Sequence, residues 1–211
     1  MNTKHWDQLH DNYTKVDWID TPTEFSQWVI KHLSPNGKLL DIGGGQGQDS
    51  RFFADKGYNV TLLDISPRGL ELAKEKTSKK LQKNLSFYQH DISKLLPFSD
   101  SSFDFVYTHL AIHYFNKKTT KQIFDEMYRI LKKDGIIAIF TNSINDPEYN
   151  TGVKIEKDFF EISGVRKRYF SIETMIEFTK GFDTIAIDEK GSTPKDRAVN
   201  TNNLIRYIGK K

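Results

Sequence analysis

The sequence predicts an α/β fold built on a doubly wound, mostly parallel sheet of seven strands, with helices on both faces. Short apolar runs alternate with amphipathic segments along most of the 211 residues, which is typical of strands connected by helices. The last two apolar runs, 183–188 and 204–208, have only a polar loop, 191–203, in the chain between them. We therefore expect them to form an antiparallel hairpin at one edge of the sheet.

The first strand is followed by a glycine-rich turn. The apolar run 39–42 ends at glycines 43, 44, 45 and 47, and a helix over 49–56 and a strand over 58–63 come next. Glycine lets the backbone adopt positive φ and lie directly against a ligand. Asp64 ends the second strand, 64 − 47 = 17 residues beyond the last glycine. Nucleotide-binding α/β proteins place a ribose-binding carboxylate about 20 residues on, so Asp64 is our predicted ribose ligand.

The glycine spacing argues against a dinucleotide. The fingerprint G-x-G-x-x-G requires a third glycine. A count from Gly43 reaches Gln48 at that place, and a count from Gly45 reaches Ser50. A nicotinamide oxidoreductase is therefore disfavoured.

The turn reads Asp41-x-Gly43-x-Gly45-x-Gly47. This acid-led triple resembles motif I of the class I S-adenosylmethionine-dependent methyltransferases, whose sheet is Rossmann-like. The run LLPFSDSSFDF, from residue 95 to residue 105, resembles the LPF-acid-x-x-FD run of the same family. The resemblance implies S-adenosylmethionine as cofactor and S-adenosylhomocysteine as product. It also implies that Asp41 helps to hold the methionine end.

The resemblance assigns further residues to the cofactor. Asp91 and Ile92 follow the third strand, 85–88, and match positions that meet the adenine. Ile65 follows Asp64 and joins the same site, and Thr108 takes the place of a residue whose backbone contacts the methionine moiety. In small members of the family an aromatic N-terminal helix folds over the cofactor. Trp6 and Tyr13, in the helical region 1–33, are candidates for that lid, with core packing as the alternative.

Capping residues predict where several helices begin. Thr23 is a plausible N-cap, and Ser66-Pro67 starts a helix that we expect to run through Lys80. Ser171 caps a helix through Lys180, and an amphipathic helix covers 119–133. Strands are expected over 103–107 and 136–140.

Two histidines follow the strand 103–107. His109 and His113 are four residues apart and would share a face if 110–115 were helical. His113 falls where family members with an L-x-L-H-Y run carry histidine, so it could orient or deprotonate the acceptor. A structural histidine is the alternative for this position. No third metal ligand stands at a recognisable spacing, so no metal site is predicted.

Regular patterning weakens between residues 141 and 170. Within a single methyltransferase domain over 1–211, a loop this long predicts a lid or small insertion on the acceptor side. Arg166 and Arg168 in this segment, and Tyr114 before it, are our candidate acceptor contacts. A solvated basic turn is the alternative reading of the arginines.

Composition limits the other functions. No cysteine is present, which excludes disulfides and thiolate chemistry, and the net charge of +3 does not predict nucleic-acid binding. No apolar run approaches the roughly 20 residues of a membrane span, and the polar start lacks the apolar core of a signal peptide. We expect a cytoplasmic monomer or homodimer.

The acceptor is predicted to be a small molecule, because almost the whole chain is assigned to the catalytic core. No nucleophile is required, since the sulfonium is already an activated electrophile. Methylation of RNA or protein, directed by the basic segment 154–168, is one alternative. A subunit or sensor that binds S-adenosylmethionine without turnover is the other.

Overall fold

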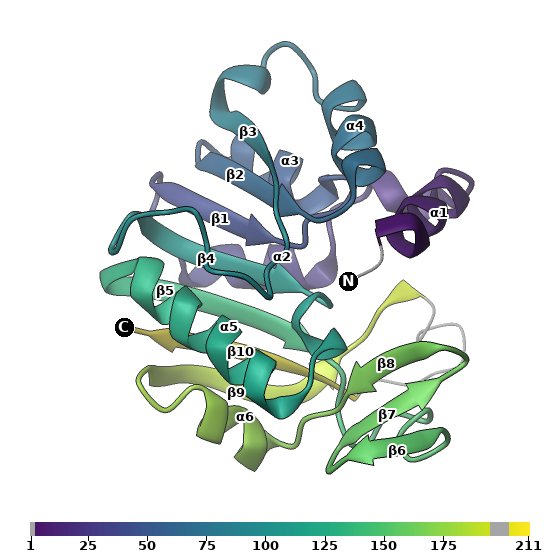
Figure 1. Ribbon diagram of the computed structural model, residues 1–211. Helices are drawn as coiled ribbons and strands as arrows, with labels where there is room; N and C mark the ends of the chain where they lie inside the picture. The colour runs from purple at the N-terminus through teal and green to yellow at the C-terminus, as the bar shows by residue number, and fades with distance from the viewer. Residues whose placement is uncertain (1–2, 195–202) are drawn as a thin grey trace.

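The computed structural model describes residues 3–194 and 203–211. Its main sheet has the strand order β3-β2-β1-β4-β5-β10-β9 (Figure 1). The strands are β1 (Lys38–Ile42), β2 (Asn59–Asp64), β3 (Leu85–Gln89), β4 (Phe103–His109), β5 (Leu131–Thr141), β9 (Asp183–Gly191) and β10 (Leu204–Lys210). Only β10 pairs antiparallel, with β5 and β9. The predicted Rossmann-like sheet and its antiparallel edge are therefore confirmed; most of the loop predicted over 191–203 lies outside the described residues.

Helices cover both faces of this sheet, because neighbouring residues of a strand point to opposite faces. Leu39 packs in the cluster that contains Phe53 and Phe105, whereas Leu40 packs with Ile123 and Met127. Helices α2 (Glu24–Val29), α3 (Gln48–Asp55) and α4 (Pro67–Glu75) lie on the first face, and α5 (Lys117–Ile130) and α6 (Ile172–Phe178) lie on the second. Helix α1 (Thr3–Tyr13) packs against α4. The described residues also contain four short 3₁₀ helices: η1 (Asp17–Asp20), η2 (Ile30–His32), η3 (Gln82–Asn84) and η4 (Ile112–Tyr114).

Local capping signals placed the helix starts correctly. The side chains of Thr23, Ser66 and Ser171 each accept a hydrogen bond from the third residue beyond them. Helix ends were predicted less well. Helix α4 stops at Glu75 rather than Lys80, and the Thr77 hydroxyl donates to the carbonyl oxygen of Ala73 at 2.6 Å.

Helix α5 ends at Ile130, although the sequence predicted a helix through residue 133. Leu131 pairs with Phe103 of β4 and therefore already belongs to strand β5. The chain then turns at Asp134, where φ is 63°. Lys132 and Lys133 lie in this extension and not in the last turn of the helix.

The segment predicted as a lid or insertion contains a separate antiparallel sheet of three short strands, which lies beside the carboxyl ends of the main strands (Figure 1). These strands are β6 (Val153–Glu156), β7 (Phe159–Ile162) and β8 (Val165–Arg168). The Ser163-Gly164 pair joins β7 to β8 with φ values of 51° and 79°. Two residues with positive φ form the tight hairpin turn that suits twisted strands. Ser163-Gly164 is therefore the feature of the sequence that indicates this hairpin.

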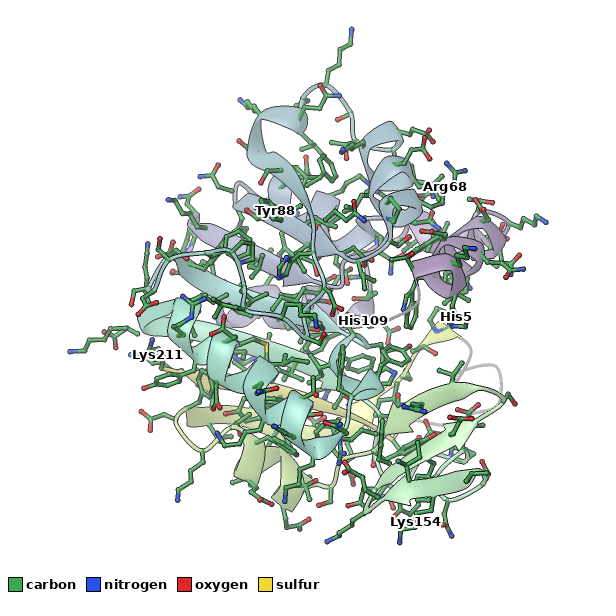
Figure 2. All side chains as sticks on the ribbon, in the orientation of Figure 1. His5, Arg68, Tyr88, His109, Lys154 and Lys211 are labelled. Atoms are coloured by element: carbon green, nitrogen blue, oxygen red, sulfur yellow. The ribbon has the colours of Figure 1, made fainter. Side chains whose placement is uncertain are left out.

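Figure 2 places His109 in the middle of the molecule, at the end of β4, whereas Lys154 lies on the outer surface of the small sheet. No helix within residues 3–194 and 203–211 combines the length and apolar character that a membrane crossing requires.

Candidate functional site

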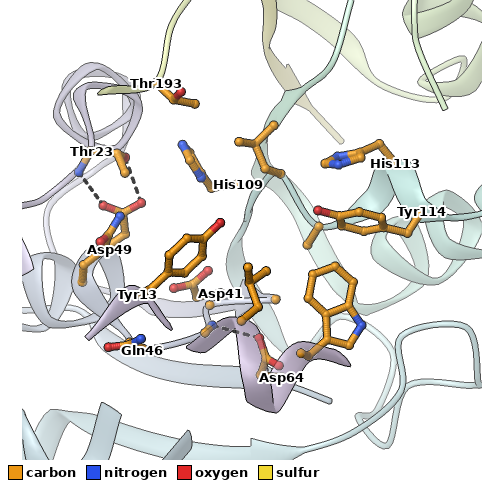
Figure 3. Close-up of a pocket in the computed structure, with 18 of the residues that line it drawn as sticks. Tyr13, Thr23, Asp41, Gln46, Asp49, Asp64, His109, His113, Tyr114 and Thr193 are labelled. Carbon is orange, nitrogen blue, oxygen red and sulfur yellow. Dashed lines mark hydrogen bonds between the residues drawn. The ribbon is translucent and has the colours of Figure 1, made fainter. Parts of the chain in front are cut away.

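A cavity of about 770 Å³ opens at the carboxyl ends of β1, β2, β3 and β4, between α1 and the small sheet (Figure 3). Most of the predicted site residues line it: Trp6, Tyr13, Asp41, Gly43, Gly45, Asp64, Ile65, Asp91, Ile92, His109, His113 and Tyr114. Four predicted residues are absent from its described lining: Gly47, Thr108, Arg166 and Arg168. The strand ends of an open α/β sheet are where ligands bind, and the cavity lies at that place.

The glycine turn requires glycine for two reasons. Gly43, Gly45 and Gly47 have φ values of 72°, 52° and 74°, which side chains with a Cβ rarely adopt. A Cβ on Gly43 would also lie 2.2 Å from the Cβ of Ala111. Gly47 faces Leu62 and not the cavity, since a Cβ there would approach Leu62 Cδ1 to 2.9 Å. Glycine at this position allows α3 to pack closely against the sheet.

Asp64 is buried at the end of β2 and is fixed by two backbone donors. The N–H of Gly45 donates to Oδ2 at 2.9 Å (Figure 3), and the N–H of Ser66 donates to Oδ1 at 2.8 Å. Burial raises the pKa of Asp64, against the opposing effects of Ser66, His10 and Gly45. A carboxylate can accept about four hydrogen bonds, so Asp64 retains acceptor capacity toward the cavity.

Asp41 is buried at the end of β1, where the hydroxyl of Ser50 donates to Oδ2 at 2.5 Å. Burial raises the pKa of Asp41 to about 8, and the hydrogen bond from Ser50 opposes that rise only partly. At neutral pH the side chain is therefore mainly the neutral acid.

Asp91 and Ile92 line the cavity beyond β3, and the N–H of Ser93 donates to Asp91 Oδ1 at 2.9 Å. Thr108 lies inside the sheet, paired with Ile42 of β1, and is fully buried. The next residue of β4, His109, is the one that lines the cavity.

Helix α1 closes one side of the cavity through specific contacts. Asp7 accepts a hydrogen bond from the Ser66 hydroxyl at 2.6 Å, and Asp11 pairs with Arg68 at 2.7 Å. Both predicted lid residues line the cavity from this helix, and Trp6 meets the ring of Tyr114 edge to face, with ring centres 4.6 Å apart. The helix thus bridges from α4 to the far wall of the cavity.

His10 of α1 is a lining residue that the sequence analysis missed. A Cβ on Gly45 would lie 2.7 Å from its Cε1, and a Cβ on Gly69 would lie 2.8 Å from its Nε2. Burial lowers the pKa of His10, although nearby Asp64 opposes this. Two glycines far apart in the chain therefore leave room for this ring, and no local sequence signal reveals that.

The two predicted histidines do not share a helical face, because Leu110 has a φ of 54° and interrupts the chain between them. The His109 ring stacks on Phe140 at 4.7 Å between ring centres, and burial lowers its pKa. Burial also lowers the pKa of His113 to about 3, with smaller contributions from Lys167 and His109. His113 is therefore neutral near pH 7 and poorly suited to accept a proton from an acceptor.

The position of the proton on His113 follows from its surroundings. Nδ1 is buried without a hydrogen-bond partner in the described part of the chain. An N–H there would be buried without an acceptor, so we assign the proton to Nε2. His113 then offers a hydrogen-bond donor and not a base.

The two arginines predicted to contact the acceptor do not line the cavity. Alternate residues of a strand share a face, so Arg166 and Arg168 of β8 point away from the face of Lys167. Arg168 is buried against the carbonyl oxygen of Phe115 at 3.0 Å and pairs with Glu156, and Arg166 pairs with Glu161 at 3.2 Å. Lys167 is the residue of this run that lines the cavity, where it pairs with Glu148.

The unusual pKa of Asp41 gives a stability prediction. In the unfolded chain its pKa falls to an ordinary value of about 3.9. Its stabilising contribution is fully present below that pH and is lost as pH rises toward the folded value of about 8. Asp41→Asn, which cannot ionise, should therefore lose less stability between pH 5 and 8 than the unchanged protein, by up to about 1.4 kcal/mol per pH unit. Urea unfolding across this range measures the difference, and equal slopes would contradict it.

Comparison with known proteins identifies the segment that carries this site. Residues 40–139 match a family described as "Methyltransferase domain". The chain is 33% identical over 117 residues to an uncharacterised methyltransferase of Synechocystis, which covers 54% of this chain and 52% of that protein. The chain thus spans about half the length, or less, of the curated relatives it matches.

Solved structures share the fold. A S-adenosylmethionine-dependent methyltransferase from Methanosarcina mazei superposes with a TM-score of 0.74 at 23% identity, covering 87% of this chain and 96% of that chain. The 1,6-didemethyltoxoflavin-N1-methyltransferase of Burkholderia thailandensis, solved with 1,6-didemethyltoxoflavin and S-adenosylhomocysteine, superposes with a TM-score of 0.75 at 17% identity, covering 99% and 86%.

The segment matched by the family runs from β1 into β5, so it contains the glycine turn, Asp64, Asp91 and His109. The sequence likeness and the cavity therefore concern the same residues. The part of the chain that carries this site is thus similar to methyltransferase domains.

Proposed function

We propose that this protein transfers the methyl group of S-adenosylmethionine to a small-molecule acceptor by in-line displacement. The observation that carries the proposal is the shape of the cavity. It continues from Asp64 and Asp91 past α1 to Glu148 and Lys167 beside the small sheet. A site of about 770 Å³ falls in the usual range of small-molecule sites.

S-adenosylmethionine is the cofactor of this family, and the residues at the strand ends fit it. The glycine turn presents bare backbone to the cavity, where a Cβ on Gly45 would already meet His10 at 2.7 Å. Asp64 has acceptor capacity left for ribose hydroxyls. In our proposal Asp64 binds the ribose, Asp91 and Ile92 meet the adenine, and Asp41 with Gly43 lies against the methionine part.

The bound cofactor supplies a methyl group on a positively charged sulfur, which is already reactive toward a lone pair. The protein therefore has to orient the acceptor and exclude water. Aromatic residues suit both tasks, and the cavity is lined by Trp6, Tyr13, Trp18 and Tyr114. Their faces favour a cationic sulfur and the apolar body of an acceptor. His113, neutral with its proton assigned to Nε2, would donate a hydrogen bond to the acceptor.

A macromolecular acceptor has less support. The three basic residues 166–168 are all engaged in ion pairs, with Glu161, Glu148 and Glu156. A charge that is neutralised within the protein contributes little attraction to phosphate groups. The structurally similar methyltransferase from Burkholderia was solved with 1,6-didemethyltoxoflavin bound, which agrees with a small-molecule acceptor here.

The direct test is transfer of labelled methyl from S-adenosylmethionine to a panel of small phenols, amines, thiols and N-heterocycles. We expect label in at least one small product and equimolar S-adenosylhomocysteine, with rates that change little between 50 and 200 mM salt. Transfer to RNA that falls steeply with salt would favour the alternative acceptor. Tight cofactor binding with no S-adenosylhomocysteine formed across the panel would indicate a sensor.

Asp64→Ala tests the proposed ribose contact. Loss of a hydrogen bond to a charged group costs about 1.5–3 kcal/mol, so the dissociation constant of S-adenosylhomocysteine should rise by about 10- to 150-fold. Titration calorimetry measures it. Asp55→Ala, which changes an exposed carboxylate on α3 that pairs with Lys80, is the matched control. Unchanged affinity in Asp64→Ala would remove this residue from the site.

His113→Gln tests whether His113 donates or accepts a proton. The variant should lower kcat/KM for the acceptor by about 10-fold, the scale of one lost hydrogen bond, with cofactor affinity unchanged. Because burial puts the pKa of His113 at about 3, the pH profile of the unchanged enzyme should show no ionisation of this group between pH 5 and 8. An inflection in that range that disappears in the variant would instead make His113 a base. His32→Gln, outside the cavity lining, is the control.

A further inference from the structure

A buried carboxylate on α3 has no part in the site as described so far. Asp49 is 5% exposed and lines the cavity. Its Oδ1 accepts the N–H of Thr23 at 2.8 Å, and its Oδ2 accepts the hydroxyls of Thr23 at 2.8 Å and of Tyr107 at 2.6 Å (Figure 3 shows the Thr23 contacts). Three donors therefore converge on one carboxylate at the wall of the cavity.

In all of these contacts Asp49 is the acceptor. A backbone N–H can only donate, and burial raises the pKa of Tyr107 well above its ordinary value, so the phenol keeps its proton and donates. A carboxylate can accept about four hydrogen bonds, and Asp49 uses three. One acceptor position is left for a group in the cavity.

The position of Asp49 relative to the strand ends indicates which group. The neighbouring Ser50 donates to Asp41, so Asp49 and Asp41 lie close together at the start of α3. In the view of Figure 3, Asp41 lies between Asp49 and Asp64. In the binding mode proposed above, the nucleoside lies at Asp64 and Asp91 and the methionine part lies at Asp41, so Asp49 is the neighbouring carboxylate of the same cavity.

That part of the cofactor carries an ammonium group, a compact cation with three donors. Buried cations require a charged partner. Asp41 is poorly suited, because burial keeps it mainly protonated near neutral pH. Asp49 is the neighbouring carboxylate whose contacts all stabilise negative charge.

We propose that Asp49 binds the amino group of the methionine part of the cofactor, and that Thr23 and Tyr107 hold its carboxylate in place. Asp49 has this role only if the cavity binds the cofactor as described above. The assignment does not depend on the identity of the methyl acceptor. The competing explanation is purely structural, since the same contacts join α2, α3 and β4.

Two ligands separate these explanations. S-adenosylhomocysteine and 5′-methylthioadenosine share the nucleoside and the sulfur, but only the first has the amino-acid part. In calorimetric titration, Asp49→Asn should weaken S-adenosylhomocysteine by about 10-fold or more and change the affinity for 5′-methylthioadenosine by less than 2-fold. Tyr107→Phe, which removes one supporting donor and leaves the carboxylate, should lower the same selectivity by a smaller factor.

Equal weakening of both ligands would make Asp49 structural, and unchanged affinity for both would exclude it from the site; either result overturns the assignment. If Asp49→Asn does not fold, Tyr107→Phe decides, because unchanged selectivity in that variant overturns it equally. If the unchanged protein binds neither ligand, the cofactor site itself is wrong, and the proposed function falls with it. Transfer activity is not needed for any of these readings.

Discussion

The hydrogen bonds that the Asp64 carboxylate accepts from Gly45 and Ser66 hold the site together, at 2.9 and 2.8 Å. One joins the end of β2 to the glycine turn, and the other fixes the start of α4. The same Ser66 donates through its hydroxyl to Asp7 of α1 at 2.6 Å. A buried acceptor without a hydrogen-bond partner would be costly. The glycine turn, the start of α4 and helix α1 are therefore held in position by the hydrogen bonds of Asp64 and Ser66. The geometry of the cavity depends on this carboxylate before any ligand enters.

Three carboxylates share this small volume, and the fold gives each a different environment. Asp41 has one hydroxyl donor and a pKa raised to about 8 by burial. Asp64 has two backbone donors, and Asp49 has one backbone and two hydroxyl donors. Like charges at such close range cannot all be ionised cheaply. Protonation of Asp41 relieves that repulsion, and it leaves negative charge where donors already stabilise it. The three side chains are chemically identical, so the number of hydrogen-bond donors around each carboxyl group determines which of them is best suited to carry negative charge.

Sequence reasoning succeeded where the determining contacts are local. The cap residues Thr23, Ser66 and Ser171, the glycine turn and the strand ends all depend on near neighbours in the chain. It failed where contacts between residues far apart in the chain determine the structure. Helix α5 ends early because Leu131 pairs with Phe103 of another strand, and Lys167 replaces the two flanking arginines at the cavity because an unpredicted strand fixes the alternation. His10 depends on space left by Gly45 and Gly69, and Asp49 depends on Thr23 and Tyr107. None of these contacts can be inferred from the spacing of residues in the chain.

Aromatic contacts join helix α1 to two 3₁₀ helices beside the cavity. Trp6 of α1 meets Tyr114 of η4 at 4.6 Å, and Tyr13 meets Trp18 of η1 at 5.3 Å. Edge-to-face pairs of this kind contribute about 0.5–1.5 kcal/mol each, so these rings help to hold α1 beside the cavity. No side chain of helix α1 is fully buried. The helix is placed by these rings, by the His10 ring beside Gly45 and Gly69, and by the contacts of Asp7 and Asp11 with α4. The wall that α1 forms therefore depends on side chains of η1, η4 and α4 as well as on its own, and a change in any of these segments should alter the cavity.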